Sequence, residues 1–407
     1  MKFKNLSLSD WRQFEKINLE FHPRLTILTG ANGSGKTSLL SILGRHYQWD
    51  IPFVGTPWRN RSTPSTNYRL ERIRLLNSET GGREVIGQLV YDSGETSEIT
   101  APPQGGQQYH LEYSAMRQVR GLHIPSHRPM QSYKVVPTIP TEGITMQRAY
   151  SEYYGSAYSQ YQGNHTQKSP MQVMKEALMS FALFGKGNEF VVPDEAAFAA
   201  FVGFQEVLRN VLPSKLGFRK LQINAPDVLL ETDTGTFPLD AVSGGVSSII
   251  DIAWRIFMKA RDGEEFVCTI DEPENHLHPE LQQSLLPSLI RTFPDVQFIV
   301  ATHSPFMISA VYDSAVFVLD YNPGRRVQSE QLDAVNKAGT ANEILREVLG
   351  LPFTMPLWAE EKMGEIVAKY SELGVDESNI TAIESEIREA GLGSLLPGKP
   401  KSQVPND

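Results

Sequence analysis

A glycine-rich turn near the amino terminus carries the residues with the clearest chemistry. The spacing Gly30-x4-Gly35-Lys36-Thr37 follows an apolar run at 25–29 and precedes another at 39–43, so a strand, a turn and a helix are expected. Glycines let backbone N–H groups surround a phosphate, Lys36 can supply positive charge, and Thr37 can offer a hydroxyl to Mg²⁺. The pattern predicts a P-loop that binds a nucleoside triphosphate through Gly30, Asn32, Gly33, Ser34, Gly35, Lys36, Thr37 and Ser38.

Two acidic residues end an apolar run at 266–270, which is the form expected of a Walker B strand beside a P-loop. Asp271 is predicted to hold Mg²⁺ together with Thr37, and Glu272 is predicted to polarise the attacking water as the general base. Without the P-loop, the same two acids could simply cap a turn or a helix. Cys268 lies inside the run and is expected to pack in the core rather than to react.

A histidine follows the next apolar run, at 297–301, in the sequence Thr302-His303-Ser304. A histidine at this place can form a hydrogen bond with the γ-phosphate and respond to its loss. A lone histidine would more often be a surface or core residue. Its position after the strand that succeeds Walker B favours the functional interpretation, and Lys36, Glu272 and His303 are the predicted catalytic residues.

A Ser-Gly-Gly turn precedes a helical pattern at 246–259. Ser243 could be an ordinary N-cap of that helix. The same turn could also form a second anion site at the helix N-terminus, in which Ser243 and Gly245 contact a nucleotide.

The elements that must position these residues follow from the hydrophobic periodicity. Alternating runs at 3–8 and 17–21 predict half-buried strands that lead into the P-loop. Further alternating segments predict an antiparallel β subdomain beside the nucleotide core, around 70–76, 84–91, 97–101 and 109–113. Helices are expected over 171–183, 195–211 and 246–259, and again near 341–349, 358–372 and 376–390.

Residues 133–170 are polar and irregular, and their length predicts a mobile or functional loop. Five tyrosines gather in it. They could form a stacking platform for single-stranded nucleic acid or a protein interface. These are Tyr150, Tyr153, Tyr154, Tyr158 and Tyr161.

The composition limits the classes of protein to which the chain can belong. The chain has 407 residues, one cysteine and a net charge of −9. A single cysteine excludes an intramolecular disulfide, and neither a signal peptide nor a membrane-spanning run is evident, so a cytoplasmic protein without a membrane contact is expected. Any nucleic-acid contact must come from a local basic patch, because the overall charge is negative.

The order of the motifs resembles the ABC-type ATPase head, in the branch shared by the SMC and RecF group and the OLD-type ATPases, over roughly residues 1–320. Residues 242–246 are similar to the Leu-Ser-Gly-Gly-Gln signature, although Val246 replaces its polar last residue. Residues 271–279 are similar to the corresponding sequence motif of OLD-like heads, and residues 301–305 are similar to the motif that carries their switch histidine. The Q-loop glutamine has only two weak candidates, Gln88 and Gln131.

The resemblance implies an α/β fold, that of a P-loop NTPase of ABC-ATPase type with an antiparallel β subdomain and a helical lobe that carries the signature motif. It implies ATP and Mg²⁺ as cofactors. It also implies a homodimer or higher homo-oligomer in which ATP lies between Lys36 of one head and Ser243 and Gly245 of the other. Glu274 and Asn275 would then lie in the loop that touches the partner subunit.

The same resemblance suggests a domain division. It comprises an ATPase lobe with the P-loop and the β subdomain at 1–135, and a mobile loop with the helical signature lobe at 136–260. The Walker B and switch-histidine part of the core follows at 261–320, then a helical C-terminal region at 321–395 and a disordered tail at 396–407.

What the chain lacks narrows the function. The stretch between P-loop and signature has no heptads, which argues against an SMC-type tether, and the region after His303 has no Asp-x-Asp of a Toprim nuclease. The chain resembles stand-alone ATPase subunits of anti-phage systems such as PARIS, Septu and some retrons. The predicted function is an ATPase that senses or scaffolds and controls an effector protein in trans.

The alternative is a RecF-like repair ATPase that binds DNA. Five arginines in or beside the β subdomain could contact the DNA backbone, or could form an ordinary solvated face. They are Arg59, Arg61, Arg69, Arg72 and Arg74.

Overall fold

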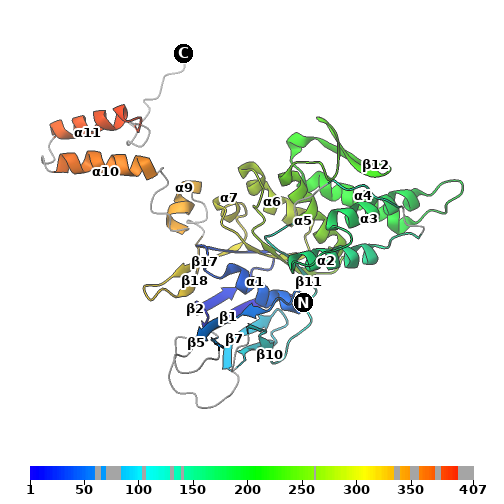
Figure 1. The fold of residues 1–407 in the computed structure, drawn as a ribbon, viewed down its shortest axis with the longest axis horizontal. Helices are drawn as coiled ribbons and strands as arrows, with labels where there is room; N and C mark the ends of the chain where they lie inside the picture. The colour runs from blue at the N-terminus through cyan, green and yellow to red at the C-terminus, as the bar shows by residue number, and fades with distance from the viewer. Residues whose placement is uncertain are drawn as a thin grey trace. The chain divides into compact units, whose positions relative to one another are not determined.

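The structure is a computed structural model that describes residues 1–59, 66–69, 84–102, 107–128, 133–138, 142–260, 263–333, 340–348, 357–371 and 377–392. The chain divides into two compact units, Met1–Ile344 and Leu345–Asp407 (Figure 1). The five-part division expected from the sequence is finer than this and stays a prediction. The predicted tail at 396–407 and the predicted strand near 70–76 lie outside the described residues.

The first unit is built on one mixed sheet with the strand order β10-β8-β7-β1-β2-β18-β17-β3-β16-β15-β11. β17, β3, β16, β15 and β11 run parallel to one another, whereas β10, β8, β7, β1 and β2 pair antiparallel. The strand bounds are β1 (Phe3–Trp11), β2 (Phe14–Glu20), β3 (Leu25–Gly30), β7 (Glu84–Tyr91), β8 (Thr96–Ala101), β10 (Glu112–Tyr113), β11 (Gly121–Ile124), β15 (Phe266–Asp271), β16 (Val296–Ala301), β17 (Ala315–Tyr321) and β18 (Val327–Gln331).

The antiparallel strands expected from the sequence are therefore present, but they belong to the same sheet as the nucleotide core. β18 makes the connection, because it pairs antiparallel with β17 on one side and parallel with β2 on the other. The mixed α/β sheet, with a P-loop at the end of a central parallel strand, confirms the α/β fold predicted from the sequence. Smaller pairs flank the sheet: β4 (Phe53–Val54) with β9 (Gln108–Tyr109), and β5 (Thr56–Arg59) with β6 (Thr66–Arg69).

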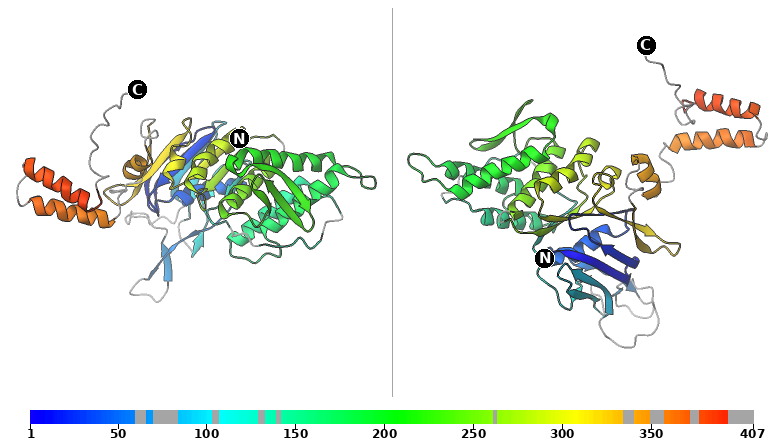
Figure 2. Two further views of the ribbon diagram at one scale, coloured as in Figure 1. Left: turned by 90° about the horizontal axis from the view of Figure 1, so that it is seen from above. Right: turned by 180° about the vertical axis from the view of Figure 1, so that it is seen from behind.

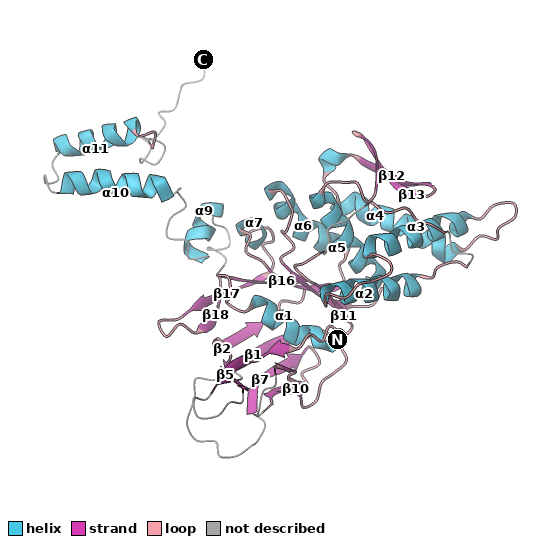
Figure 3. Cartoon of the chain, in the orientation of Figure 1, coloured by secondary structure: helices cyan, strands magenta, loops and turns pink. Residues whose placement is uncertain are grey.

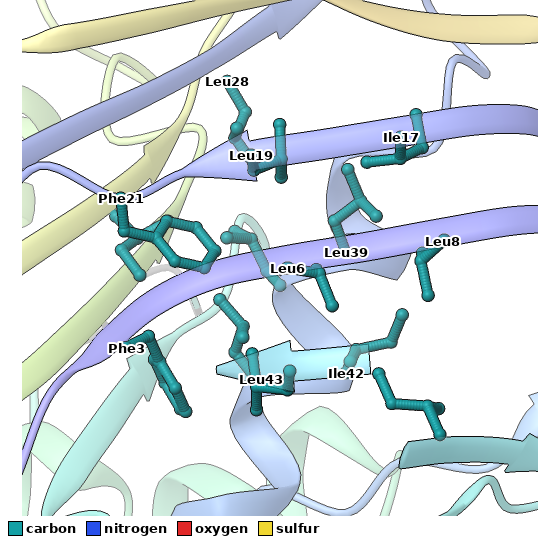
Figure 4. Packing of buried hydrophobic residues seen from close by; sticks show 14 of the residues in the cluster. Phe3, Leu6, Leu8, Ile17, Leu19, Phe21, Leu28, Leu39, Ile42 and Leu43 are labelled. Carbon is teal, nitrogen blue, oxygen red and sulfur yellow. The ribbon is translucent and has the colours of Figure 1, made fainter. Parts of the chain in front are cut away.

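The core of this unit lies between the sheet and the first helix. β3, β15 and β16 are buried at every position, as expected for parallel strands covered on both faces. Figure 4 shows α1 (Lys36–Gly44) placing Leu39, Ile42 and Leu43 against side chains of β1 and β2. Burial of each such side chain contributes about 1.5–3 kcal/mol. Cys268 in β15 is fully buried, which agrees with a packing role.

Helices gather at the other side of the first unit (Figure 3). α3 (Pro170–Lys186) and α4 (Glu195–Val211) form an antiparallel hairpin, seen from two further directions in Figure 2. α5 packs against α2, α4 and α6. The remaining bounds are η1 (Arg45–Tyr47), α2 (Met146–Tyr161), η2 (Ser214–Leu216), β12 (Phe218–Asn224), β13 (Asp227–Thr232), β14 (Gly235–Pro238), α5 (Gly244–Ala260), α6 (Pro279–Thr292), α7 (Pro305–Ile308), α9 (Ala341–Glu343) and η3 (Ile344–Val348).

The prediction of a long loop over 133–170 is wrong, because α2 occupies Met146–Tyr161. Thr145 caps the helix by accepting a hydrogen bond from Arg148 N. The tyrosines recur at helical spacing and pack inward. Tyr153 is buried, and the rings of Tyr154, Tyr158 and Tyr161 surround Trp49. The tyrosines therefore attach a helix to the core, and they do not form an open stacking platform.

The second unit contains α10 (Leu357–Ser371) and α11 (Glu377–Glu389), which match the helices expected at 358–372 and 376–390. They pack through Ala359, Ile366 and Ile387. An ion pair of 2.9 Å between Lys369 Nζ and Glu386 Oε2 also joins them. Among the described residues, every helix is too short or too polar to cross a lipid bilayer.

Candidate active site

The P-loop between β3 and α1 has the backbone geometry of an anion cradle. Gly30, Gly33 and Gly35 have φ values of 136°, 81° and 99°, which side chains with a Cβ rarely adopt. A Cβ on Gly30 would lie 2.3 Å from Leu319 O, and one on Gly35 would lie 2.4 Å from the ring of Phe14. The loop exposes Asn32 and Gly33 and buries Ser34, whereas Ser38 is half-buried on α1. The backbone conformation therefore favours glycine at all three positions, and space also requires it at Gly30 and Gly35.

The buried side chain of Lys36 folds back over this loop. Its Nζ donates hydrogen bonds to Gly30 O at 3.0 Å and to Ala31 O at 3.1 Å. Burial lowers the Lys36 pKa to about 8, although nearby carboxylates oppose the shift. A phosphate bound in the loop would give this ammonium a charged acceptor in place of carbonyl oxygens.

Thr37 and Asp271 meet at the start of α1 and the end of β15. Thr37 Oγ1 donates a hydrogen bond of 2.8 Å to Asp271 Oδ2, whereas Asp271 Oδ1 is buried without a partner in the described part of the chain. Burial, together with the neighbouring carboxylates of Glu272 and Glu274, raises the pKa of Asp271 to about 6, although the hydrogen bond from Thr37 opposes the shift. A hydroxyl beside a buried carboxylate oxygen that lacks a partner is a donor set that suits Mg²⁺.

Glu272 and His303 face each other beside that pair. Their Oε1 and Nε2 atoms lie 3.9 Å apart, and both side chains are about one-third exposed. Glu272 has a φ of 46°, and its Oε2 accepts a hydrogen bond from Asn275 Nδ2 at 3.0 Å. Burial and the charge of Lys36 lower the pKa of His303, so its imidazole is neutral at pH 7. The structure thus brings Lys36, Thr37, Asp271, Glu272 and His303 together.

Glu274 positions the histidine from within the same chain. Its Oε1 accepts hydrogen bonds from Thr302 Oγ1 at 2.7 Å and from His303 N at 2.6 Å. The carboxylate is buried, and this burial raises its pKa. The resemblance placed Glu274 at a partner contact, which stays a prediction. The structure adds an intramolecular role that a single sequence does not reveal.

Arg128 is a residue of this site that the sequence did not single out. β11 pairs with β15, so the segment after β11 lies next to Glu272. Arg128 Nη2 lies 3.3 Å from Glu272 O, 3.4 Å from Pro273 O and 3.4 Å from Asn275 O. The guanidinium therefore holds the backbone of the loop that carries the predicted base.

The two candidates for a Q-loop glutamine do not occupy this place. Gln88 lies exposed on β7, in the antiparallel part of the sheet and away from the P-loop strand, which argues against this candidate. Gln131 lies outside the described residues.

Ser243 and Gly245 are not brought to the P-loop by their own chain. They stand at the start of α5, and a Cβ on Gly245 would lie 3.0 Å from His276 O. Within the described part of the chain, the Ser243 side chain has no hydrogen bond, and neither residue bonds to Lys36, Glu272 or His303. The expected contact of Ser243 and Gly245 with a nucleotide stays a prediction.

Comparison with known proteins agrees with the P-loop site. A family model described as "AAA ATPase domain" matches residues 162–308, and one described as "AAA domain" matches residues 5–44. Septu protein PtuA of Bacillus thuringiensis is 28% identical over 167 residues, which cover 37% of this chain and 42% of that protein. The Retron Ec83 probable ATPase of Escherichia coli is 28% identical over 162 residues, covering 37% of this chain and 27% of that protein.

A shorter stretch of the chain is similar to a repair protein. DNA replication and repair protein RecF of Staphylococcus haemolyticus is 50% identical over 43 residues, covering 11% of this chain and 12% of that protein. The chain thus spans less than half the length of the curated relatives it matches. The matches confirm the resemblance that the motifs predicted.

Proposed function

We propose that this chain, an ABC-type ATPase head related to the Septu and retron ATPases, forms a closed dimer with a second copy of itself around ATP and Mg²⁺. This closure controls a separate effector protein, and the system acts in anti-phage defence. The ATPase assignment follows from the relatives and the P-loop site together. Dimerisation, the effector and the defence role are the proposed part.

The observation that carries the proposal is the separation of the two halves of the site. Lys36, Thr37, Asp271, Glu272 and His303 converge in one place, whereas the signature turn at Ser243 has no hydrogen-bond partner for its side chain in the described part of its own chain. A second head related by a two-fold axis would present its signature turn to the P-loop, and the reverse contact would form at the same time. ATP then stabilises only the closed pair, because the complete site exists only there.

Each residue has a role in hydrolysis that its position supports. Lys36 and the P-loop amides bind the phosphates, and Thr37 with Asp271 would hold Mg²⁺, which neutralises phosphate charge. Glu272 accepts the proton of the water whose oxygen attacks the γ-phosphorus, and ADP leaves as the bond to the β–γ bridging oxygen breaks. His303 donates to a γ-phosphate oxygen through its neutral ring. Loss of that phosphate then removes the contact that closes the pair.

The defence role rests on the relatives, two of which are ATPases named after Septu and a retron. The surface that would hold the effector is proposed on the second unit. Trp358, Val367 and Ile380 of its helices are exposed by 58%, 52% and 46%, so apolar area is available there.

The decisive test is Glu272→Gln. Turnover should fall about 100-fold or more, while ATP-dependent dimerisation, measured by light scattering, persists or strengthens. Ser243→Arg should abolish dimerisation and leave binding of one ATP to each chain. Normal ATP turnover in Glu272→Gln would contradict the assignment of Glu272 as the general base. Dimers that form equally well without ATP would contradict the proposal that ATP controls dimerisation.

The effector is tested with the same variant. Glu272→Gln purified from its native host with ATP should retain a stoichiometric second polypeptide, which the wild-type chain releases on hydrolysis. Recovery of a bare dimer that retains DNA would instead favour the RecF-like alternative. The arginines predicted for DNA contact cannot decide this, since Arg61, Arg72 and Arg74 and the side chains of Arg59 and Arg69 lie outside the described part.

A further inference from the structure

A cavity of about 490 Å³ opens between the end of β11 and the helix α2. Its wall includes His127, Arg128, Gln160, Tyr161 and Arg255. None of the P-loop residues, Asp271, Glu272 or His303 is part of that described wall. Sites for small molecules in proteins typically have volumes of about 300–1,000 Å³, so this cavity has the size for a metabolite.

The wall is basic. Two arginines and a histidine contribute to it, and its described residues include no acid. The charge of Arg255 is already compensated, because its Nε lies 2.9 Å from Asp251 Oδ2 and Tyr153 also bonds to that carboxylate. Arg128 is different. Its hydrogen bonds within the described residues go to carbonyl oxygens, and its Nε is buried without a partner.

Arg128 is half-buried, and desolvation lowers its pKa; the nearby charges of Asp251 and Glu274 offset this shift only in part. An anionic group in the cavity would accept from the free Nε–H and supply the missing charge. Phosphate suits this place, since guanidinium groups bind phosphate oxygens with strong hydrogen bonds.

Two further groups in the wall restrict the ligand. Gln160 Oε1 is buried without a partner among the described residues, whereas its Nε2 donates to Thr166 Oγ1 at 3.0 Å. The free oxygen requires a donor, such as a hydroxyl or an amino group. Tyr161 adds an aromatic wall on which a planar ring can stack.

We propose that this cavity binds a phosphorylated, nucleotide-sized small molecule, with the phosphate at Arg128 and a hydroxyl or amino donor at Gln160. The site is distinct from the P-loop. It communicates with the hydrolysis site through one side chain, because Arg128 also bonds to the backbone of Glu272, Pro273 and Asn275.

Occupation of the cavity would therefore regulate hydrolysis. A phosphate on Arg128 Nε fixes the guanidinium that holds the loop of the base, and the rate of ATP turnover should change as a result. By linkage, closure of the head around ATP should change the affinity of the cavity for its ligand. This regulatory part rests on the proposed ATPase function, whereas the binding part does not.

The binding test uses the Lys36→Ala chain, in which the P-loop is disabled, and AMP as the probe in titration calorimetry. AMP should bind at one site per chain, more tightly than inorganic phosphate. His127→Glu and Gln160→Glu each place a carboxylate in the wall and should weaken AMP at least tenfold. Gln162→Glu makes the same change on an exposed residue just after α2 and should leave binding unaltered.

Thermal unfolding of each variant establishes that it is folded, and exposed His127 provides a change that does not disturb the core. Absence of AMP binding to the Lys36→Ala chain, or equal binding by His127→Glu and the control, would overturn the site. If AMP binds no more tightly than inorganic phosphate, the proposal that the ligand is nucleotide-sized is wrong.

The regulatory arm uses the chain with an intact P-loop at saturating ATP. AMP should change turnover at least twofold in the wild-type chain and in Gln162→Glu, but not in His127→Glu. An equal response in all three would overturn regulation through the cavity. A chain without ATPase activity would contradict the proposed function and leave the binding result standing.

Discussion

Thr37 Oγ1 donates a hydrogen bond of 2.8 Å to Asp271 Oδ2, although 234 positions separate the two residues in the chain. The contact brings the start of α1 to the end of β15. It leaves the second oxygen of the carboxylate buried and free of partners within the described residues. The two side chains proposed to hold Mg²⁺ therefore contact each other directly.

Asp271→Asn should abolish the response of this site to Mg²⁺. The amide keeps the size of the side chain and can still accept from Thr37, but it lacks the negative charge that a divalent cation requires. We expect ATP turnover to fall about 100-fold and the Mg²⁺ concentration for half-maximal turnover to rise. Thermal unfolding with and without Mg²⁺ and ATP checks this, since the stabilisation by the metal complex should disappear. Unchanged Mg²⁺ dependence would show that other residues hold the metal.

Glu274→Ala should reduce turnover by releasing His303. The carboxylate accepts from Thr302 Oγ1 and from His303 N, so its removal leaves two buried donors without an acceptor. We expect kcat to fall at least tenfold with a smaller change in KM. Glu274→Gln keeps one acceptor oxygen and should retain more of the rate. Thr302→Val should shift kcat in the same direction by less. A loss confined to KM would contradict this positioning role.

Lys175→Met should destabilise the helical part of the first unit. The ammonium is buried and bonds to Asp227 Oδ1 and Asp240 Oδ2, both at 2.9 Å, and to Lys134 O at 2.7 Å. Breaking a buried pair by removing one partner costs about 3–5 kcal/mol, because the remaining charge is uncompensated. Urea unfolding measures the loss. The double variant with Asp240→Asn should recover part of it, and a cost below about 1 kcal/mol would show that the ion pairs do not matter.

Asp240 also connects this cluster to the proposed signature turn, since Ser243 follows three residues later in the same non-helical segment before α5. The Lys175→Met variant should therefore dimerise more weakly with ATP than its loss of stability explains. Lys215→Met is the matched control. It removes an exposed ion pair with Glu280, and surface pairs contribute only about 0–1 kcal/mol.

His46 should make the protein sensitive to mild acid. The ring is buried among Phe3, Tyr91 and Tyr113, and burial lowers its pKa from 6.5 to about 4. The folded state thus favours the neutral ring. The stabilisation is complete above pH 6.5 and is lost as pH falls through about 4, amounting to about 3 kcal/mol. Unfolding free energies at pH 7 and pH 4.5 should differ less in His46→Gln than in the wild type. Equal slopes would show that other groups control acid unfolding.

The sequence predicted the parts of the site whose chemistry is local. The P-loop, the acids after β15 and the histidine after β16 each follow an apolar strand, so neighbouring residues indicate both their structure and their chemistry. The strands and most helices followed from periodicity for the same reason. The proximity of Asp271 and His303 to Lys36 could be predicted only from the known order of such motifs.

The parts that were missed depend on distant contacts. Arg128 contacts Glu272, 144 positions later, so nothing near it in the sequence indicates its partner. α2 was taken for a loop because tyrosine, serine and glycine are weak helix formers. Its helical state comes from packing on Trp49, whose position in space the local pattern does not contain. Gln88 was only a candidate for the Q-loop, because a glutamine on a strand does not indicate where in the sheet that strand lies.

The position of β3 in the sheet has a consequence for biosynthesis. Its two neighbours, β16 and β17, are the strands that begin at Val296 and Ala315, so the P-loop strand emerges from the ribosome long before anything that pairs with it. Contacts so distant in sequence make folding slow, and an apolar strand that waits unpaired is exposed to aggregation. The nucleotide pocket can form only after most of the first unit has been translated. Nascent chains truncated before β16 should therefore depend on chaperones and fail to retain ATP.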